Sequence, residues 1–190
     1  MRIGIMGSGN VGGTLGRAWS RAGHEMRHGG RTSSPDGSVG SHQDVADWAE
    51  VIVFAVPGAA TAGIASGIAP ALAGKPVIDA SNRMAGPALN SLTEIGAAAP
   101  KARLHRAFST IGWEVMADPT FGLDRADLFH CGDEADREVV AGLIEDVGFR
   151  PVWLGGPEEA DVVDGLTRVW FALAVRRGLG RHLAFRMLGA

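Results

Sequence analysis

Several residue types that proteins often rely on are scarce or missing in this 190-residue chain. It has no tyrosine, one cysteine and only two lysines, Lys75 and Lys101. The single cysteine, Cys131, excludes an internal disulfide, so a reducing, cytoplasmic setting is the simpler expectation. No apolar run approaches the roughly 18 residues that cross a membrane, and no signal-peptide pattern opens the chain, so we expect no membrane segment.

The same scarcity excludes several kinds of chemistry. Without tyrosine there can be no tyrosine–lysine reductase dyad, and no Gly-x-Ser-x-Gly pattern offers a serine nucleophile. No Cys-x-x-Cys spacing suggests a metal site, so we expect none. A net charge of −3 argues against a general nucleic-acid binder. Cys131 and His105 both fall in predicted strands, and a structural role is the favoured interpretation of each.

What the chain does have is a glycine-rich stretch near its start. A short apolar run, containing Ile3 and Ile5, is followed by Gly-x-Gly-x-x-Gly and then by a helical pattern. Strand, glycines and helix in this order are typical of a dinucleotide-binding motif. Its predicted cofactor-binding residues are Gly7, Ser8, Gly9, Asn10, Val11 and Gly12.

Each glycine of this motif has its own expected role. Gly7 permits a tight turn, Gly9 lets the backbone approach a pyrophosphate, and Gly12 lets the helix pack closely on the strand. The free N–H groups of the helix's first turn would point at the phosphates. The alternative is a glycine-rich turn without a ligand.

The end of the second predicted strand indicates which dinucleotide would bind. An NAD-binding protein places an acidic residue about 20 residues past the glycines, but here the chain reads Gly29-Gly30-Arg31-Thr32-Ser33-Ser34. A guanidinium with neighbouring hydroxyls suits a 2′-phosphate, so Arg31, Thr32 and Ser33 predict NADP(H). An ordinary polar surface turn is the alternative.

The rest of the chain alternates between strand and helix patterns, which predicts an α/β fold with a doubly wound, mostly parallel sheet. We expect one domain over residues 1–190, with residues 155–190 forming a helical extension that packs on it. Ser81 and Asn82 follow a predicted strand at the edge where such sheets bind ligands. Further expected elements are helices over 87–98 and 157–176, a loop over 109–114, and a short helix after residue 180.

Few residues are equipped for acid–base catalysis, which favours hydride transfer between two cofactors that supply the chemistry themselves. Ser81, His105, Ser109 and Thr110 remain as alternatives. Two other functions stay open: a small carbonyl or imine reductase completed by a dimer partner, and a non-catalytic NADP(H)-sensing or partner-binding module.

Several motifs, taken together, resemble one family. They are Gly7 to Gly12, Gly30-Arg31, Phe54-Ala55-Val56-Pro57, Thr110-Ile111, Cys131-Gly132-Asp133, Gly165-Leu166-Thr167 and Gly178-Leu179-Gly180. In this order they resemble the NADP-dependent oxidoreductases of the deazaflavin coenzyme F420. The resemblance implies a Rossmann-type fold, a homodimer, and F420 or a flavin as second substrate beside NADP(H).

The resemblance also implies roles for residues away from the glycines. Ala55, Val56 and Pro57 would line the nucleotide cleft. Ser109, Thr110 and Ile111 would lie beside the stacked rings, with no dedicated catalytic residue. Independently of these roles, the arginines of the C-terminal region could receive a polyanionic tail of the acceptor, but a solvated helix end is the favoured interpretation. These arginines are Arg168, Arg176, Arg177, Arg181 and Arg186.

Overall fold

The computed structural model describes residues 1–30, 39–83 and 88–189. Its centre is an eight-stranded sheet in the order β10-β9-β6-β5-β4-β1-β2-β3, parallel except between β6 and β9. The predicted α/β fold with a doubly wound, mostly parallel sheet is confirmed. The strands of this sheet are β1 (Arg2–Met6), β2 (Glu25–Gly29), β3 (Val39–Gly40), β4 (Val51–Phe54), β5 (Pro76–Asp79), β6 (Arg103–Arg106), β9 (Asp127–Gly132) and β10 (Arg150–Trp153).

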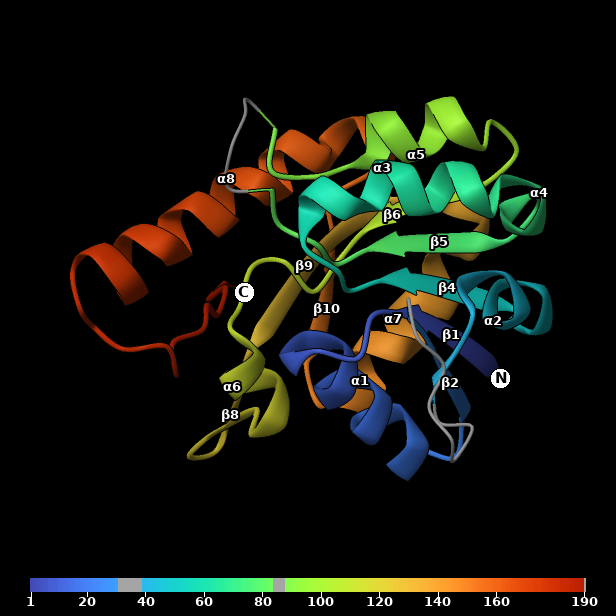
Figure 1. The fold of residues 1–190 in the computed structure, drawn as a ribbon. Coiled ribbons are helices and arrows are strands. Elements are labelled where there is room, and N and C mark those ends of the chain that lie inside the picture. Colours follow the sequence, from blue (N-terminus) through green and yellow to red (C-terminus); the bar gives the residue numbers. More distant parts are fainter. Residues whose placement is uncertain (31–38, 84–87, 190) are drawn as a thin grey trace.

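Helices cover both faces of the sheet, as Figure 1 shows. On one face lie α2 (His42–Trp48), α3 (Gly58–Gly67), α4 (Ala69–Leu72) and α5 (Leu92–Ala98). On the other lie α1 (Asn10–Arg21), α6 (Trp113–Ala117) and α7 (Arg137–Val147). Strand β4 explains why both layers are needed. Its Val51 and Val53 enter one core and its Ile52 and Phe54 the other, as a strand buried on both faces requires.

The last long helix extends past the sheet. Helix α8 (Ala160–Phe171) packs on β9 and continues as a π-helical turn, η3 (Ala172–Arg176), beyond the edge at which β1, β4 and β5 end (Figure 1). We call this the carboxyl edge. The short 3-10 turns η1 (Glu134–Asp136) and η2 (Pro157–Glu159) precede α7 and α8.

Three sequence-based predictions of secondary structure were wrong. The helix expected over 87–98 begins only at Leu92, because the backbone before it is bonded to buried carboxylates. The loop expected over 109–114 already turns into α6 at Trp113. The tail after residue 180 is not helical within its described part; it returns to the sheet, where Phe185 forms a bridge with Asp127.

A small hairpin, β7 (Thr120–Phe121) and β8 (Asp124–Arg125), was not predicted. It lies beside α6, and the returning tail packs on it: the ring of His182 stacks on Phe121 with their centroids 4.7 Å apart. No helix among the described residues is long and apolar enough to cross a membrane.

Candidate functional site

The glycine-rich turn lies where β1 meets its two neighbours, β2 and β4. The chain leaves β1 toward one side and later returns to the other, so this is the point where the strand order reverses. Gly7 has a φ of 111° and its N–H donates to the Gly29 carbonyl at 2.9 Å. A Cβ at Gly7 would lie 2.6 Å from the Ala55 carbonyl oxygen, so only glycine fits this turn.

Gly9 and Gly12 meet opposite surroundings. A Cβ on Gly12 would collide with the Gly7 carbonyl oxygen, which shows how closely α1 approaches β1. A Cβ on Gly9 would meet nothing within 4 Å. Gly9 is the N-cap of α1, no side chain caps the helix, and its first turn holds no acidic residue. The start of α1 therefore leaves its N–H groups and positive dipole end open to an anion.

The neighbouring ends of β4 and β5 bring further predicted residues to the carboxyl edge. Ala55 and Val56 are half-buried and Pro57, the N-cap of α3, is exposed. Ser81 is buried, and its hydroxyl donates to Asp79 at 2.5 Å. The Asn82 amide donates to the Ser109 carbonyl at 3.4 Å, which joins two predicted segments. The Ser81 hydroxyl is thus already hydrogen-bonded to Asp79, which the sequence did not indicate.

A buried charge network lies directly behind these residues, and the sequence analysis missed it. Arg106 on β6, Asp79 on β5 and Asp164 on α8 have no exposed surface. The Arg106 guanidinium donates to Asp164 at 2.9 Å, to the Ser81 carbonyl at 2.5 Å and to the Asn82 side chain at 2.8 Å. A charged side chain inside a buried strand needs a partner of opposite charge. The position of Arg106 in a predicted strand could therefore have indicated a buried ion pair.

The two carboxylates of this network hold the segment after β5. Asp164 accepts from the backbone N–H groups of Leu89 and Asn90 at 3.1 and 2.9 Å, and Asp79 accepts from that of Ser91 at 2.6 Å. Burial raises the pKa of Asp79, against the opposing effect of Arg106. The network therefore fixes Ser81, Asn82 and residues 89–91 between the sheet and α8.

The loop after β6 carries the residues expected beside the rings. Phe108 is buried and adopts a φ of 61°, a strained value for a non-glycine residue and of a kind that clusters at functional sites. Ser109 accepts from the Thr167 hydroxyl at 3.4 Å. Thr110 and Ile111 are buried, and the Thr110 hydroxyl has no hydrogen-bond partner.

The remaining titratable candidates lie away from this edge or inside the core. His105 is fully buried, 3.6 Å from Asp136, and burial lowers its pKa. Burial raises the pKa of Cys131 to about 12. Lys75 and Lys101 precede β5 and β6, at the opposite edge of the sheet. In the described ranges no group of three or more His, Cys, Asp or Glu residues could hold a metal.

Two groups of predicted binding residues are not brought together at this edge by the described structure. Arg31, Thr32 and Ser33 lie outside the described residues. The C-terminal arginines do not form one cluster: Arg181 pairs with Glu114 at 2.5 Å, and Arg186 pairs with Asp124. Arg168, Arg176 and Arg177 are all exposed, but only Arg168 and Arg176 line a pocket beside α8. The expectation that all five receive one polyanionic tail does not fit this arrangement.

The chain is similar to known redox proteins in sequence and in structure. Residues 2–83 match the family model of the coenzyme F420-dependent NADP oxidoreductases. A solved structure from Arthrobacter sp. FB24, described as a candidate F420-dependent NADP reductase, superposes with a TM-score of 0.87 at 26% identity, covering 100% of both chains. No curated protein sequence matches the chain.

Two further solved structures share the fold. The hypothetical protein SMa0349 from Sinorhizobium meliloti has a TM-score of 0.72 at 24% identity, covering 100% of this chain and 96% of its own. Plasmodium falciparum pyrroline carboxylate reductase, solved with NADP bound, has a TM-score of 0.61 at 13% identity, covering 94% and 69%. By these matches the chain has a Rossmann fold, is similar to the F420-dependent NADP oxidoreductases over residues 2–83 in sequence, and is similar to the Arthrobacter protein over its whole length in structure.

Proposed function

We propose that this protein transfers a hydride between NADP(H) and a deazaflavin or flavin acceptor. Gly7, Ser8, Gly9, Asn10, Val11 and Gly12 would hold the pyrophosphate. The observation that carries the proposal is the open space at Gly9 above the uncapped start of α1. A phosphate fits there because the free N–H groups and the helix dipole both favour negative charge.

The rest of the carboxyl edge would receive the nicotinamide and the acceptor. Ala55, Val56 and Pro57 would line the nucleotide side, and Ser81 and Asn82 its floor. Ser109, Thr110 and Ile111 would lie beside the rings. The unpartnered, buried Thr110 hydroxyl supports this because such a group is costly without a ligand or water to pair with.

The scarcity of acid–base groups among the described residues of this edge supports a ring-to-ring transfer. The two cofactors, when bound, would supply the chemistry, which is hydride transfer between the nicotinamide and the acceptor ring with the accompanying proton exchanged with solvent. The protein then has to bind and orient both rings and exclude water. Neither lysine is near the edge, and His105 is buried away from it.

A titration tests the cofactor half of the proposal. Binding of NADPH and NADH is followed by fluorescence in the wild type and in Arg31→Ala. If Arg31 holds the 2′-phosphate, the variant should weaken NADPH by roughly 2–4 kcal/mol, the scale for losing a charged hydrogen-bonded partner, and leave NADH nearly unchanged. Equal losses for both nucleotides would contradict the role of Arg31.

Absorbance at 420 nm then tests the acceptor half. NADP⁺-dependent oxidation of the reduced deazaflavin, or its reverse with NADPH, should proceed with the purified protein alone. NADPH binding without turnover of any deazaflavin or flavin would overturn this half and leave the nucleotide site standing.

We also propose a homodimer. Large apolar side chains remain exposed along α8 and the turn after it, including Val162 at 53%, Val169 at 47% and Leu179 at 63%. Exposed apolar side chains gathered on one element are typical of association surfaces. Light scattering of the purified protein should give twice the chain mass of 19.8 kDa.

A further inference from the structure

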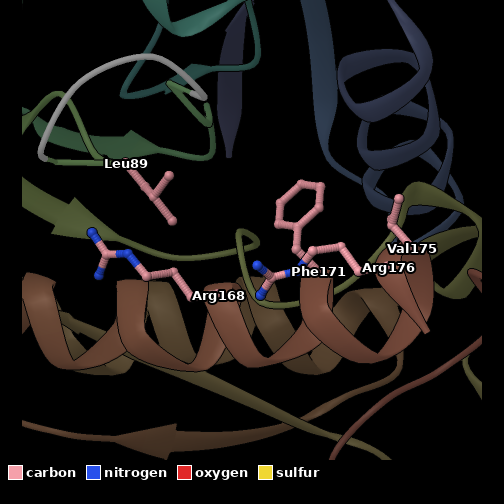
Figure 2. A pocket seen from close by; sticks show the side chains of 5 residues that line it. All are labelled: Leu89, Arg168, Phe171, Val175 and Arg176. Atoms are coloured by element: carbon pink, nitrogen blue, oxygen red, sulfur yellow. The ribbon is translucent and has the colours of Figure 1, made fainter.

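A pocket of about 360 Å³ lies between α8 and the segment that follows β5. In Figure 2, four of its side chains rise from one side of α8 and the turn after it, and Leu89 faces them from the opposite segment. The pocket is within the size range of small-molecule sites. Its lining residues are Leu89, Arg168, Phe171, Val175 and Arg176.

The pocket has an apolar centre. Leu89, Phe171 and Val175 line it, and Val175 keeps 52% of its surface exposed. An exposed apolar side chain facing a pocket favours a ligand with an apolar part, because burying that surface yields binding free energy in proportion to its area.

Two guanidinium groups flank this apolar centre. Arg168 and Arg176 both line the pocket, and none of the lining residues that the structure describes is acidic. In the described ranges Arg176 takes part in no ion pair, whereas Arg181 and Arg186 each have a carboxylate partner. The pocket therefore offers positive charge to a ligand, and guanidinium suits phosphate and carboxylate groups best.

The π-helical turn places Arg176 at this pocket. The Arg177 N–H donates to the Ala172 carbonyl at 2.9 Å, a bond between residues five apart. Residues five apart then lie nearly above one another, so Arg176 lies over Phe171 on the pocket side. An ordinary α-helix would turn residue 176 well away from that side. Such π turns are rare and occur often at functional sites.

The opposite wall of the pocket is held in place. The Leu89 N–H donates to the buried Asp164 carboxylate at 3.1 Å, one turn before Arg168 on α8. Arg106 holds the same carboxylate against the sheet. Leu89 is thus fixed before a ligand arrives, which lowers the cost of binding.

We propose that this pocket binds the hydride acceptor and selects for one that carries an anionic substituent on a flat apolar ring system. Leu89, Phe171 and Val175 contact the apolar part, and Arg168 and Arg176 contact a phosphate or carboxylate. The assignment rests on the proposed function. It places the acceptor at the same carboxyl edge as the glycine-rich turn. A phosphorylated deazaflavin and a phosphorylated flavin share the required chemistry.

Equilibrium binding in the NADP⁺-loaded protein tests the pocket. The probes are F420 and the same deazaflavin without its phosphodiester, and, as a second pair, FMN and riboflavin. In Arg176→Gln the dissociation constant of the charged member should rise about tenfold, the scale of one hydrogen bond to a charged group, and that of the neutral member should not change. Binding of the first pair would identify the acceptor as a deazaflavin, and binding of the second pair would identify it as a flavin.

Arg177→Gln is the matched control, because it removes the same charge from the neighbouring residue, which does not line the pocket. It should leave all dissociation constants at the wild-type value. Phe171→Ala should weaken the charged and neutral members alike. Equal effects of Arg176→Gln and Arg177→Gln, or no binding of any probe by the wild type, would overturn the pocket assignment. NADPH binding, measured in parallel, reports separately on the nucleotide site.

Discussion

Gly9 and Gly12 lie three residues apart and show how differently a single Cβ can act within one motif. At Gly12 it would strike the Gly7 carbonyl oxygen, and at Gly9 it would enter open space. The backbone at Gly9 has a φ of −72°, which any residue adopts. Gly12 is therefore required by the fold, whereas the fold alone gives no reason for glycine at position 9.

Gly9→Ala should accordingly separate stability from ligand binding. The urea midpoint should stay at the wild-type value, while NADPH affinity should fall by about tenfold or more, because the methyl group occupies the space where the pyrophosphate approaches. Fluorescence titration measures the affinity. Gly63→Ala is the matched control, since its Cβ also meets nothing within 4 Å but lies in α3 away from the turn. Unchanged NADPH affinity in Gly9→Ala would contradict the phosphate role.

His130 gives a residue-scale prediction about pH. Its ring is buried edge-on against Trp153, with 5.1 Å between centroids, and burial lowers its pKa to about 4. The unfolded chain binds a proton near pH 6.5 and the folded one does not. The contribution of His130 to the free energy of unfolding is therefore complete above pH 6.5. It is lost as the pH falls toward 4, by up to about 3 kcal/mol.

The comparison of wild type with His130→Gln isolates this effect. The variant has no proton to bind, so its free energy of unfolding should decline less between pH 7 and pH 4. Urea titrations at a series of pH values provide the measurement. Parallel declines in the two proteins would show that His130 does not control this range.

At the scale of elements, the tail over residues 181–187 holds α8 to the rest of the molecule. The Trp170 indole donates to the Leu183 carbonyl at 2.8 Å, and the Met187 N–H donates to Asp127 at 2.6 Å. Arg181 pairs with Glu114 on α6 and lies over the Trp170 ring, 5.3 Å from its centroid. The tail thereby joins α8, α6 and the start of β9.

Removing the chain after Gly180 should therefore destabilise the whole protein. The Trp170 indole would lose its acceptor, and Asp127 would lose the Met187 N–H while keeping Arg150. An unsatisfied buried group costs about 1–3 kcal/mol and a lost hydrogen bond about 1 kcal/mol, so we expect a loss of roughly 2–4 kcal/mol in the free energy of unfolding. Urea denaturation measures it. Leu188→Ser changes a side chain that is 85% exposed and should leave the midpoint where it was. An unaltered midpoint on truncation would mean that the tail is only a surface appendage.

At the scale of the molecule, local patterns were sufficient to predict the sheet and the opening motif. The continuous apolar run over 51–56 predicted a strand buried on both faces, and β4 is one. The glycine spacing predicted the turn before α1 and its close packing on β1. Both depend on neighbours in sequence and on the period of the strand or helix, which a sequence displays directly.

Long-range partners could not be predicted in the same way. The Leu92 start of α5 depends on carboxylates of β5 and α8, as far as 74 residues along the chain. The non-helical tail depends on Asp127 and Glu114, which compete with any helix that residues 181–187 would form alone. Tertiary contacts override local propensity at both places. The single-domain organisation and the individual cofactor contacts stay predictions.

The placement of the two lysines has a practical consequence. Lys75, Lys101 and the amino group of Met1 all precede strands of the parallel set, so every primary amine of the chain lies on the side of the sheet away from the glycine-rich turn. Coupling through amines to a sensor chip or bead would therefore attach the molecule at the amino-terminal edge of these strands. The glycine-rich turn at the carboxyl edge would then face the solution.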